Sequence, residues 1–338
     1  MSNEDVSAMN RRAAIRMLML GATLGAGAPS YAQALRELKF STEFAPHGFH
    51  APFYLARQKG WFKDAGIDLK VLDGRGSAAT VNLIGANQVG IGFVNLAAAM
   101  IAQSKGVPVV IVGSVLRRNT NGLILKKGTD IRRPADLKGK TILHLMTTIE
   151  SQLLSGYLAS AGMSLNDVKL LGVDATAKVP SVLSGKGDAA TGPVPYYLGL
   201  LKGKSEIETM AFADAGQQLL DFGIVTSPRM VKEHPELVRA FVQITSRAFE
   251  YTRRDNNVEE AVKEMISQRP EAGLDYQTAI NMFNSHIAFA MSPSTEGRPI
   301  GIVTRQDVEA TIKTLRSTGI IQGDLNPDSI VDTRFEPK

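Results

Sequence analysis

Cysteine is absent from the 338-residue chain, tryptophan occurs once, and aromatic residues make up only 6% of the sequence. Without cysteine the protein has no disulfide bonds, no thiolate metal site and no cysteine nucleophile. No run of lysines and arginines is interleaved with aromatic residues, and the formal net charge is a mild +5. The pattern of a nucleic-acid-binding surface is therefore missing, and we expect no nucleic-acid partner.

Long apolar runs are also missing, apart from one near the start of the chain. Arg11-Arg12 precedes an apolar stretch from Met17 to Ala28, which is too short to span a bilayer, and Ala32-Gln33-Ala34 follows. This order is typical of a cleavable export signal, so residues 1–34 predict a protein exported to the periplasm. Asn10–Arg16 is similar to a twin-arginine signal but departs from its pattern, which leaves the twin-arginine and general secretory routes both open.

Strands and helices alternate along the remaining chain. The predicted strands are 38–44, 68–72, 89–94, 107–112, 123–125, 141–143, 189–190 and 222–225, and helical periodicity begins again at Pro235, Tyr276 and Val308. The run 107–112 is apolar throughout, as in a strand buried in a parallel sheet. A faint echo between Leu83–Gly90 and Val182–Ala189 supports a duplicated architecture. The alternation predicts an α/β fold built from βαβ units.

The stretch Phe44–Asp68 connects the first strand to the first helix and carries His47 and His50. Such connections hold ligands in open α/β sheets. The stretch resembles the opening motif of the periplasmic binding proteins for sulfonates, nitrate, taurine and thiamine pyrimidine precursors. The residues that carry the resemblance, closest to the pyrimidine-precursor branch, are Pro46, His50, Pro52, Tyr54, Ala56, Gly60, Trp61, Phe62 and Gly66. The segment Arg133–Lys140 is also similar to the family.

The resemblance implies a type II periplasmic binding protein fold: α/β, with two lobes, each a sheet flanked by helices, and a ligand cleft between them. We expect lobe 1 to combine 35–121 with 223–338 and lobe 2 to span 122–222. The resemblance further implies a monomeric solute-binding component of an ABC importer, which captures a small molecule by hinge closure and delivers it to a permease and ATPase in the inner membrane.

The expected ligand is a thiamine-pyrimidine-type heterocycle. The loop 45–56 contains no lysine or arginine, whereas a dedicated anion site gains from fixed positive charge. The side chains of Arg75, Arg117 and Arg118 could nevertheless turn into the crevice, which would favour an anion. The alternative ligands are an alkyl sulfonate, nitrate, taurine or an aromatic carboxylate.

Candidate ligand contacts lie in the connections that follow predicted strands. His50 matches the family's histidine, His47 lies beside it, and Phe44 could supply a stacking face or merely pack between strand and helix. The further candidates, chosen by position, are Ser77, Asn95, Asn119, Thr148, Asp174 and Thr191. Ser77 and Asn95 could equally be helix caps.

His47 and His50 form a His-x-x-His pair, but no carboxylate pattern ties the remaining histidines to this loop, so we predict no metal and no cofactor. Thr147 and Glu150 have capping-box spacing, which explains Glu150 as a cap partner instead of a general base.

Two further functions compete with the importer role. The thiamine-pyrimidine synthases share the opening motif but carry a cysteine-rich tract after the second lobe, and the matching segment Leu219–Thr226 has no cysteine. We therefore expect no enzymatic activity and no catalytic residue. A periplasmic sensory or structural module that binds solute without feeding a transporter is the other alternative.

Overall fold

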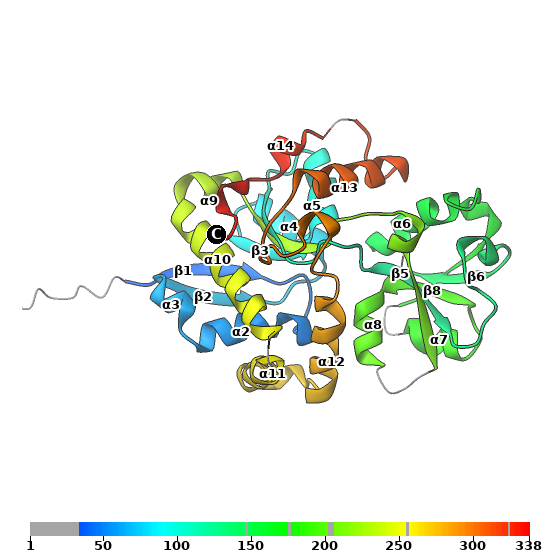
Figure 1. Ribbon diagram of the computed structural model, residues 1–338, viewed down its shortest axis with the longest axis horizontal. Coiled ribbons are helices and arrows are strands. Elements are labelled where there is room, and N and C mark those ends of the chain that lie inside the picture. Colours follow the sequence, from blue (N-terminus) through cyan, green and yellow to red (C-terminus); the bar gives the residue numbers. More distant parts are fainter. Residues whose placement is uncertain (1–33, 146–147, 175–176, 202–205, 255–256, 324) are drawn as a thin grey trace, which may run out of the picture. The chain divides into compact units, whose positions relative to one another are not determined.

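The computed structural model describes residues 34–145, 148–174, 177–201, 206–254, 257–323 and 325–338 (Figure 1). The predicted export signal thus lies outside the described residues, except for Ala34. Residues 36–338 form one compact unit. Among the described residues, none of the helices has the length and apolar character that crossing a membrane would require.

The first sheet has five strands in the order β2-β1-β3-β10-β4. Its strands are β1 (Arg36–Ser41), β2 (Ile67–Leu72), β3 (Ile91–Asn95), β4 (Val110–Ser114) and β10 (Phe222–Thr226). β1 pairs in parallel with both β2 and β3, whereas β10 runs antiparallel to β3 and β4. β10 therefore reaches this sheet from a distant part of the sequence.

The second sheet repeats this design in the order β7-β6-β8-β5-β9. Its strands are β5 (Asn121–Lys126), β6 (Thr141–His144), β7 (Lys169–Gly172), β8 (Ala189–Pro193) and β9 (Ile207–Ala211). β6 pairs in parallel with β7 and β8, and β5 runs antiparallel to β8 and β9. The two echoing segments of the sequence occupy equivalent places, because each joins a helix to the third parallel strand of its sheet.

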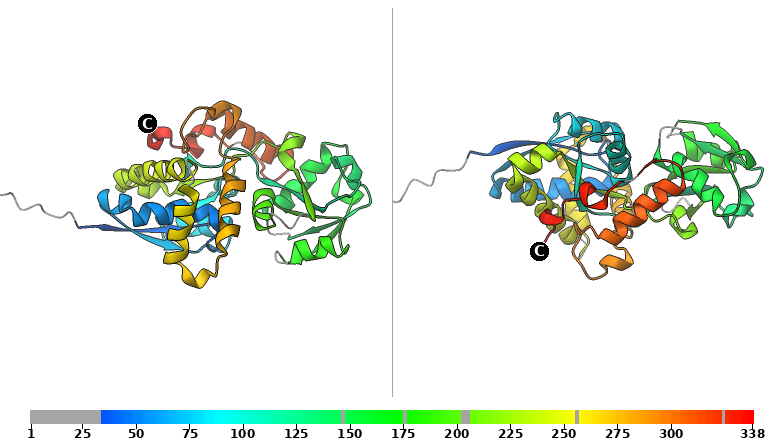
Figure 2. Two further views of the ribbon diagram at one scale, coloured as in Figure 1. Left: turned by 60° about the horizontal axis from the view of Figure 1, so that its bottom comes forward. Right: turned by 90° about the horizontal axis from the view of Figure 1, so that it is seen from above.

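Helices follow most strands of both sheets. Those of the first part are α2 (Ala51–Gln58), α3 (Trp61–Asp64), α4 (Ser77–Gly85) and α5 (Leu96–Ser104), and those around the second sheet are α6 (Ile149–Ala159), α7 (Lys178–Leu183) and α8 (Val194–Leu200). The last part contains α9 (Pro228–Glu233), α10 (Pro235–Thr252), α11 (Asn257–Gln268), α12 (Tyr276–Ile287), α13 (Arg305–Ser317) and α14 (Pro327–Ile330). Figure 2 shows the green segment gathered around the second sheet.

A phenylalanine-rich core fixes the loop that carries the two histidines. Phe49, from the short 3₁₀ helix η1 (Gly48–His50), stacks on His286 of α12 and contacts Phe249 of α10 edge to face. Gly48 allows the loop to approach α12 closely, since a Cβ there would lie 1.9 Å from the Ala279 carbonyl oxygen. Packing against two distant helices thus positions η1.

The α/β prediction is confirmed, with three local corrections. The first strand ends at Ser41, so Phe44 belongs to the loop. The run 107–112 is not buried in a parallel sheet, because β4 lies at the sheet edge and pairs antiparallel with β10. Helix α6 takes Thr148 as its N-cap, one residue later than the capping-box spacing predicts, and Thr147 lies outside the described residues.

Candidate ligand-binding site

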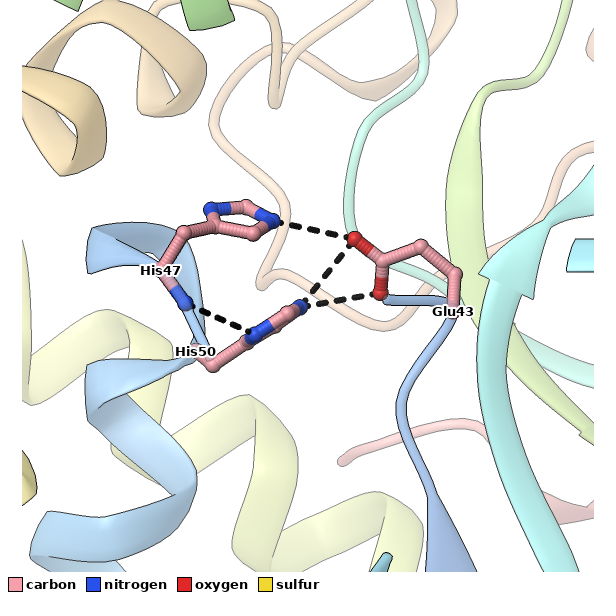
Figure 3. Close-up of side chains that lie close together, drawn as sticks. All are labelled: Glu43, His47 and His50. Atoms are coloured by element: carbon pink, nitrogen blue, oxygen red, sulfur yellow. Dashed lines mark hydrogen bonds and ion pairs between the residues drawn. The ribbon is translucent and has the colours of Figure 1, made fainter. Parts of the chain in front are cut away.

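The loop after β1 brings one carboxylate and two imidazoles together (Figure 3). The Nε2 atoms of His47 and His50 each lie 3.1 Å from Glu43 Oε1, and His50 Nε2 lies 2.9 Å from Oε2. All three residues are buried, with His50 completely inaccessible and His47 9% exposed. We call this set the Glu43 cluster.

Hydrogen bonds in the Glu43 cluster define where its protons are. Burial opposes ionisation of Glu43, but the two neighbouring histidines outweigh it and hold the pKa of this carboxyl well below its usual range. An ionised carboxylate only accepts hydrogen bonds, so both Nε2 atoms must donate. In agreement, the backbone N–H of His47 donates to His50 Nδ1 over 3.3 Å. Both Nδ1 atoms are therefore unprotonated in the neutral rings.

The Glu43 cluster also presents three potential metal ligands, since one atom from each residue lies within 4.8 Å of the other two. Sequence reasoning looked for further ligands among the remaining histidines and missed Glu43, which lies four residues before His47. Metal-bound histidines usually donate their second ring N–H to an acceptor. Here His50 Nδ1 faces a backbone donor instead. The arrangement fits two imidazole N–H groups that donate to a carboxylate better than it fits a bound metal ion. The absence of a metal stays a prediction.

His47 also borders residues from distant segments. Its ring centroid lies 6.0 Å from that of Tyr196 in α8, in an edge-on arrangement, and 5.6 Å from that of His286 in α12. The nitrogen Nδ1 of His47 is buried and has no hydrogen-bond partner among the described residues. Burial, followed by the influence of His50, lowers the pKa of His47 and favours its neutral form.

Phe44 and His50 differ from their expected surroundings. The Phe44 side chain is 56% exposed, so it does not pack between strand and helix, and its stacking role stays a prediction. His50 is fully buried, so removing its imidazole would disturb the protein interior, and a ligand contact by His50 stays a prediction.

Ser77 and Asn95 are linked by a hydrogen bond, whereas Asn119 belongs to the segment 115–120, which joins the two sheets. Ser77 Oγ accepts from the backbone N–H of Asn95 over 3.0 Å, and Asn95 caps α5 by accepting from Ala98. Asn119 is buried and donates to the Gln217 carbonyl over 2.9 Å. The capping interpretation is confirmed for Asn95, and a ligand contact by these residues stays a prediction.

Thr148, the N-cap of α6, and Thr191 of β8 come together through Ser151 of α6. The Thr148 hydroxyl donates to Ser151 Oγ over 3.2 Å, and Ser151 Oγ lies 3.2 Å from Thr191 Oγ1. Asp174, by contrast, is exposed and precedes residues outside the described part of the chain. Among the described residues, no side-chain contact links Asp174 to the other candidates.

The contacts of several buried polar residues near the candidate site residues were not predicted from the sequence. Lys178 is buried and donates to the Thr191 carbonyl over 2.7 Å and to Glu150 Oε1 over 3.2 Å, so Glu150 serves as an ion-pair partner. Arg117 is also buried and donates to the carbonyl oxygens of Pro299 and Ile302, which removes it from the arginines available to a ligand. Only Glu43 had a local signal, because an acid lies four and seven residues before the two histidines.

Two mixed five-stranded sheets flanked by helices, joined by two chain segments, define the fold of the periplasmic binding proteins. A solved structure with this fold, the alkanesulfonate-binding protein SsuA from Xanthomonas axonopodis pv. citri bound to MOPS, is similar at a TM-score of 0.68 and 16% identity, and the match covers 89% of this chain and 99% of that one. The chain belongs to the NMT1/THI5-like family, whose model matches residues 48–257.

Two relatives of this chain are named for different activities. The formylaminopyrimidine-binding protein of Halalkalibacterium halodurans is 24% identical over 243 residues, which are 71% of this chain and 73% of that protein. The Saccharomyces cerevisiae protein THI5, a 4-amino-5-hydroxymethyl-2-methylpyrimidine phosphate synthase, is 25% identical over 269 residues, with 74% of this chain and 78% of that protein covered. A binding protein and a synthase are thus both similar to this chain.

Proposed function

We propose that this protein is the periplasmic solute-binding component of an ABC importer and that its ligand is a small nitrogen heterocycle of the thiamine-pyrimidine type. The observation that carries the ligand class is the Glu43 cluster, an ionised carboxylate with two imidazoles in the loop that opens the family motif. Family membership and the formylaminopyrimidine-binding relative support the same class.

The importer role is supported by the fold and by the two joining segments, 115–120 and 212–221, between the sheets. We propose that each sheet with its helices is a lobe, at 35–121 with 223–338 and at 122–222, and that ligand closes the lobes about these segments. Export would remove residues 1–34, and the exported protein would act as a monomer with a permease and ATPase.

An alkyl sulfonate, nitrate, taurine or an aromatic carboxylate is the alternative ligand, which the fold of the sulfonate-binding neighbour supports. The negative charge of Glu43 argues against an anion at this end of the site, because no arginine or lysine is bonded to the cluster among its described contacts.

A thermal-shift panel of aminopyrimidines, aromatic carboxylates, alkyl sulfonates and nitrate tests the ligand class. A ligand at a hundred times its dissociation constant stabilises the folded state by about 2.7 kcal/mol. For a protein of this size this raises the melting temperature by several degrees, at roughly 2–4 °C per kcal/mol. A response to sulfonates alone would overturn the heterocycle. Loss of uptake of the responding compound in cells that lack this protein tests the importer role, and unchanged uptake would contradict it.

The synthase relative favours an enzyme as the second candidate. Because the chain has no cysteine, we propose binding without turnover. Mass spectrometry of the responding compound after incubation with the protein should recover it unchanged. Conversion of the compound would favour the enzyme.

A further inference from the structure

The Nδ1 atom of His47 is the buried polar atom that the protein leaves unused in the Glu43 cluster. Figure 3 shows it on the side of the ring that faces away from Glu43. Leaving a buried acceptor without a donor costs about 1–3 kcal/mol. A group supplied from outside the described residues would remove this cost, so the atom is a natural contact point for a ligand.

The hydrogen-bonding character of this atom is set from the opposite side of the ring. Glu43 Oε1 accepts the proton of His47 Nε2 over 3.1 Å, and a neutral imidazole carries only one ring proton. His47 Nδ1 therefore offers a lone pair and cannot donate. Glu43 thus acts as a positioning residue that holds His47 in one tautomer and one orientation, as carboxylates commonly do for functional histidines.

The neighbouring ring in α12 has the same character. His286 Nδ1 lies 2.7 Å from the Met282 carbonyl oxygen, which can only accept, so His286 carries its proton on Nδ1 and offers a lone pair on Nε2. The rings of His47 and His286 lie 5.6 Å apart, and the edge-on ring of Tyr196 borders His47. His47 and His286 thus each offer a lone pair close to the ionised Glu43 carboxylate.

We propose that His47 Nδ1 accepts a hydrogen bond from an N–H group of the ligand, so that the site selects a neutral or cationic amino-substituted heterocycle over its analogue without the amino group and over anions. This inference rests on the proposed binding function and adds the atom that recognises the ligand. A sulfonate or nitrate oxygen would meet a lone pair and the nearby Glu43 charge, whereas an amino group would donate to the first and be attracted by the second.

Two substitutions of His47 separate the two nitrogens of its ring. In His47→Asn the side-chain amide lies near the former Nδ1 position and retains an acceptor there. In His47→Gln the amide reaches the former Nε2 position, so contact with Glu43 is kept while the acceptor is lost. The probes are 4-aminopyrimidine and 4-methoxypyrimidine, which share the ring but differ in the N–H donor, together with methanesulfonate.

We expect the wild type to bind 4-aminopyrimidine about tenfold more tightly than 4-methoxypyrimidine, as one hydrogen bond allows. This ratio of the two affinities should fall to near one in His47→Gln and remain in part in His47→Asn. Methanesulfonate should bind the wild type more weakly than 4-aminopyrimidine does. Calorimetric titration measures the affinity of each protein for each compound. An equal preference in wild type and His47→Gln would overturn this inference while leaving the heterocycle and importer role standing.

A ligand-free measurement completes the test. The ¹⁵N chemical shifts of the His47 ring should show the Nε2–H tautomer, and Glu43→Gln should disturb it. A His47 ring protonated on Nδ1 in the wild type would overturn the inference without any ligand. If no aminopyrimidine binds, the donor-ligand inference and the heterocycle assignment fall together, whereas the uptake experiment still decides the importer role separately.

Discussion

The side-chain amide of Asn95 donates a hydrogen bond of 2.7 Å to the buried carboxylate of Asp221. The backbone N–H of Thr120 donates to the second oxygen of the same carboxylate, also over 2.7 Å. Asn95 is the last residue of β3 and caps α5, whereas Thr120 and Asp221 belong to the two segments that join the sheets. One carboxylate therefore ties both joining segments to the first sheet, at the place where a hinge would lie.

Replacing Asp221 should destabilise the protein most at acidic pH. Asp221→Asn puts an amide N–H against one of the donors, which costs about 1–3 kcal/mol of unfolding free energy. Burial raises the pKa of Asp221 to about 6, above the value of about 3.9 in an unfolded chain. The folded state therefore binds this proton more tightly, and the stability that Asp221 contributes falls as pH rises from about 4 to 6.

Urea unfolding of wild type and Asp221→Asn at pH 5 and pH 7 checks this prediction. The difference between the two proteins should be larger at pH 5. Every other titrating group is common to both proteins, so its effect cancels in the difference. The same difference at both pH values would show that Asp221 keeps an ordinary pKa in the folded state.

His286 should make the protein lose stability in acid. Burial, and next the neighbouring His47, lowers the pKa of His286 to about 3. The unfolded chain then takes up the proton first, so stability is lost as pH falls below about 6.5, by up to about 1.4 kcal/mol for each pH unit. In His286→Gln this dependence should flatten between pH 6.5 and 4, measured by urea unfolding. An unchanged slope would assign the acid sensitivity to other groups.

The sequence predicted the sheet strands and the loop with His47 and His50 because these features are local. The alternating strand at 38–44, the closing Gly60 and the family motif at 44–68 follow one another directly in the sequence. The edge strands β7 and β9 were missed. β7 is exposed along its whole length, so its sequence lacks the alternation of apolar and polar residues that predicts a half-buried strand.

The polar partners were harder to predict, since they depend on tertiary structure. Lys178 meets Glu150 across 28 positions of sequence, and Asn95 meets Asp221 across 126. No short-range spacing encodes such pairs. Glu43 was overlooked although it lies only four and seven residues before the two histidines, because the contact also depends on η1, which turns the loop back so that both histidines face this acid.

The Lys178–Glu150 pair allows a double-mutant test of stability. Lys178→Met leaves the Glu150 carboxylate buried without its cation and should cost about 3–5 kcal/mol. Adding Glu150→Gln removes the unpaired charge and should recover a large part of that loss. Urea unfolding of the wild type, both single variants and the double variant measures the coupling. Strictly additive losses would mean that the two groups do not interact in solution.

Gly199 of α8 provides a test of lobe closure. A Cβ at Gly199 would lie 2.5 Å from the Cα of Met282 in α12, and this backbone atom cannot move aside as a flexible side chain would. Gly199→Ala should therefore force α8 and α12 apart. Overpacking of this kind costs about 1–3 kcal/mol.

If ligand binding requires these helices to approach one another, Gly199→Ala should weaken the affinity by about 5–150-fold, which is the equivalent of that cost. If the two helices separate in the ligand-free protein, its stability should change by less than about 0.5 kcal/mol. Leu198→Ala, at an exposed position of the same helix, should change neither quantity. Calorimetric titration with the compound that responds best in the thermal-shift panel, together with urea unfolding, measures both. Unchanged affinity in Gly199→Ala would show that binding does not bring α8 against α12. A loss of ligand-free stability equal to the loss of binding free energy would show that the two helices are already packed together before the ligand binds.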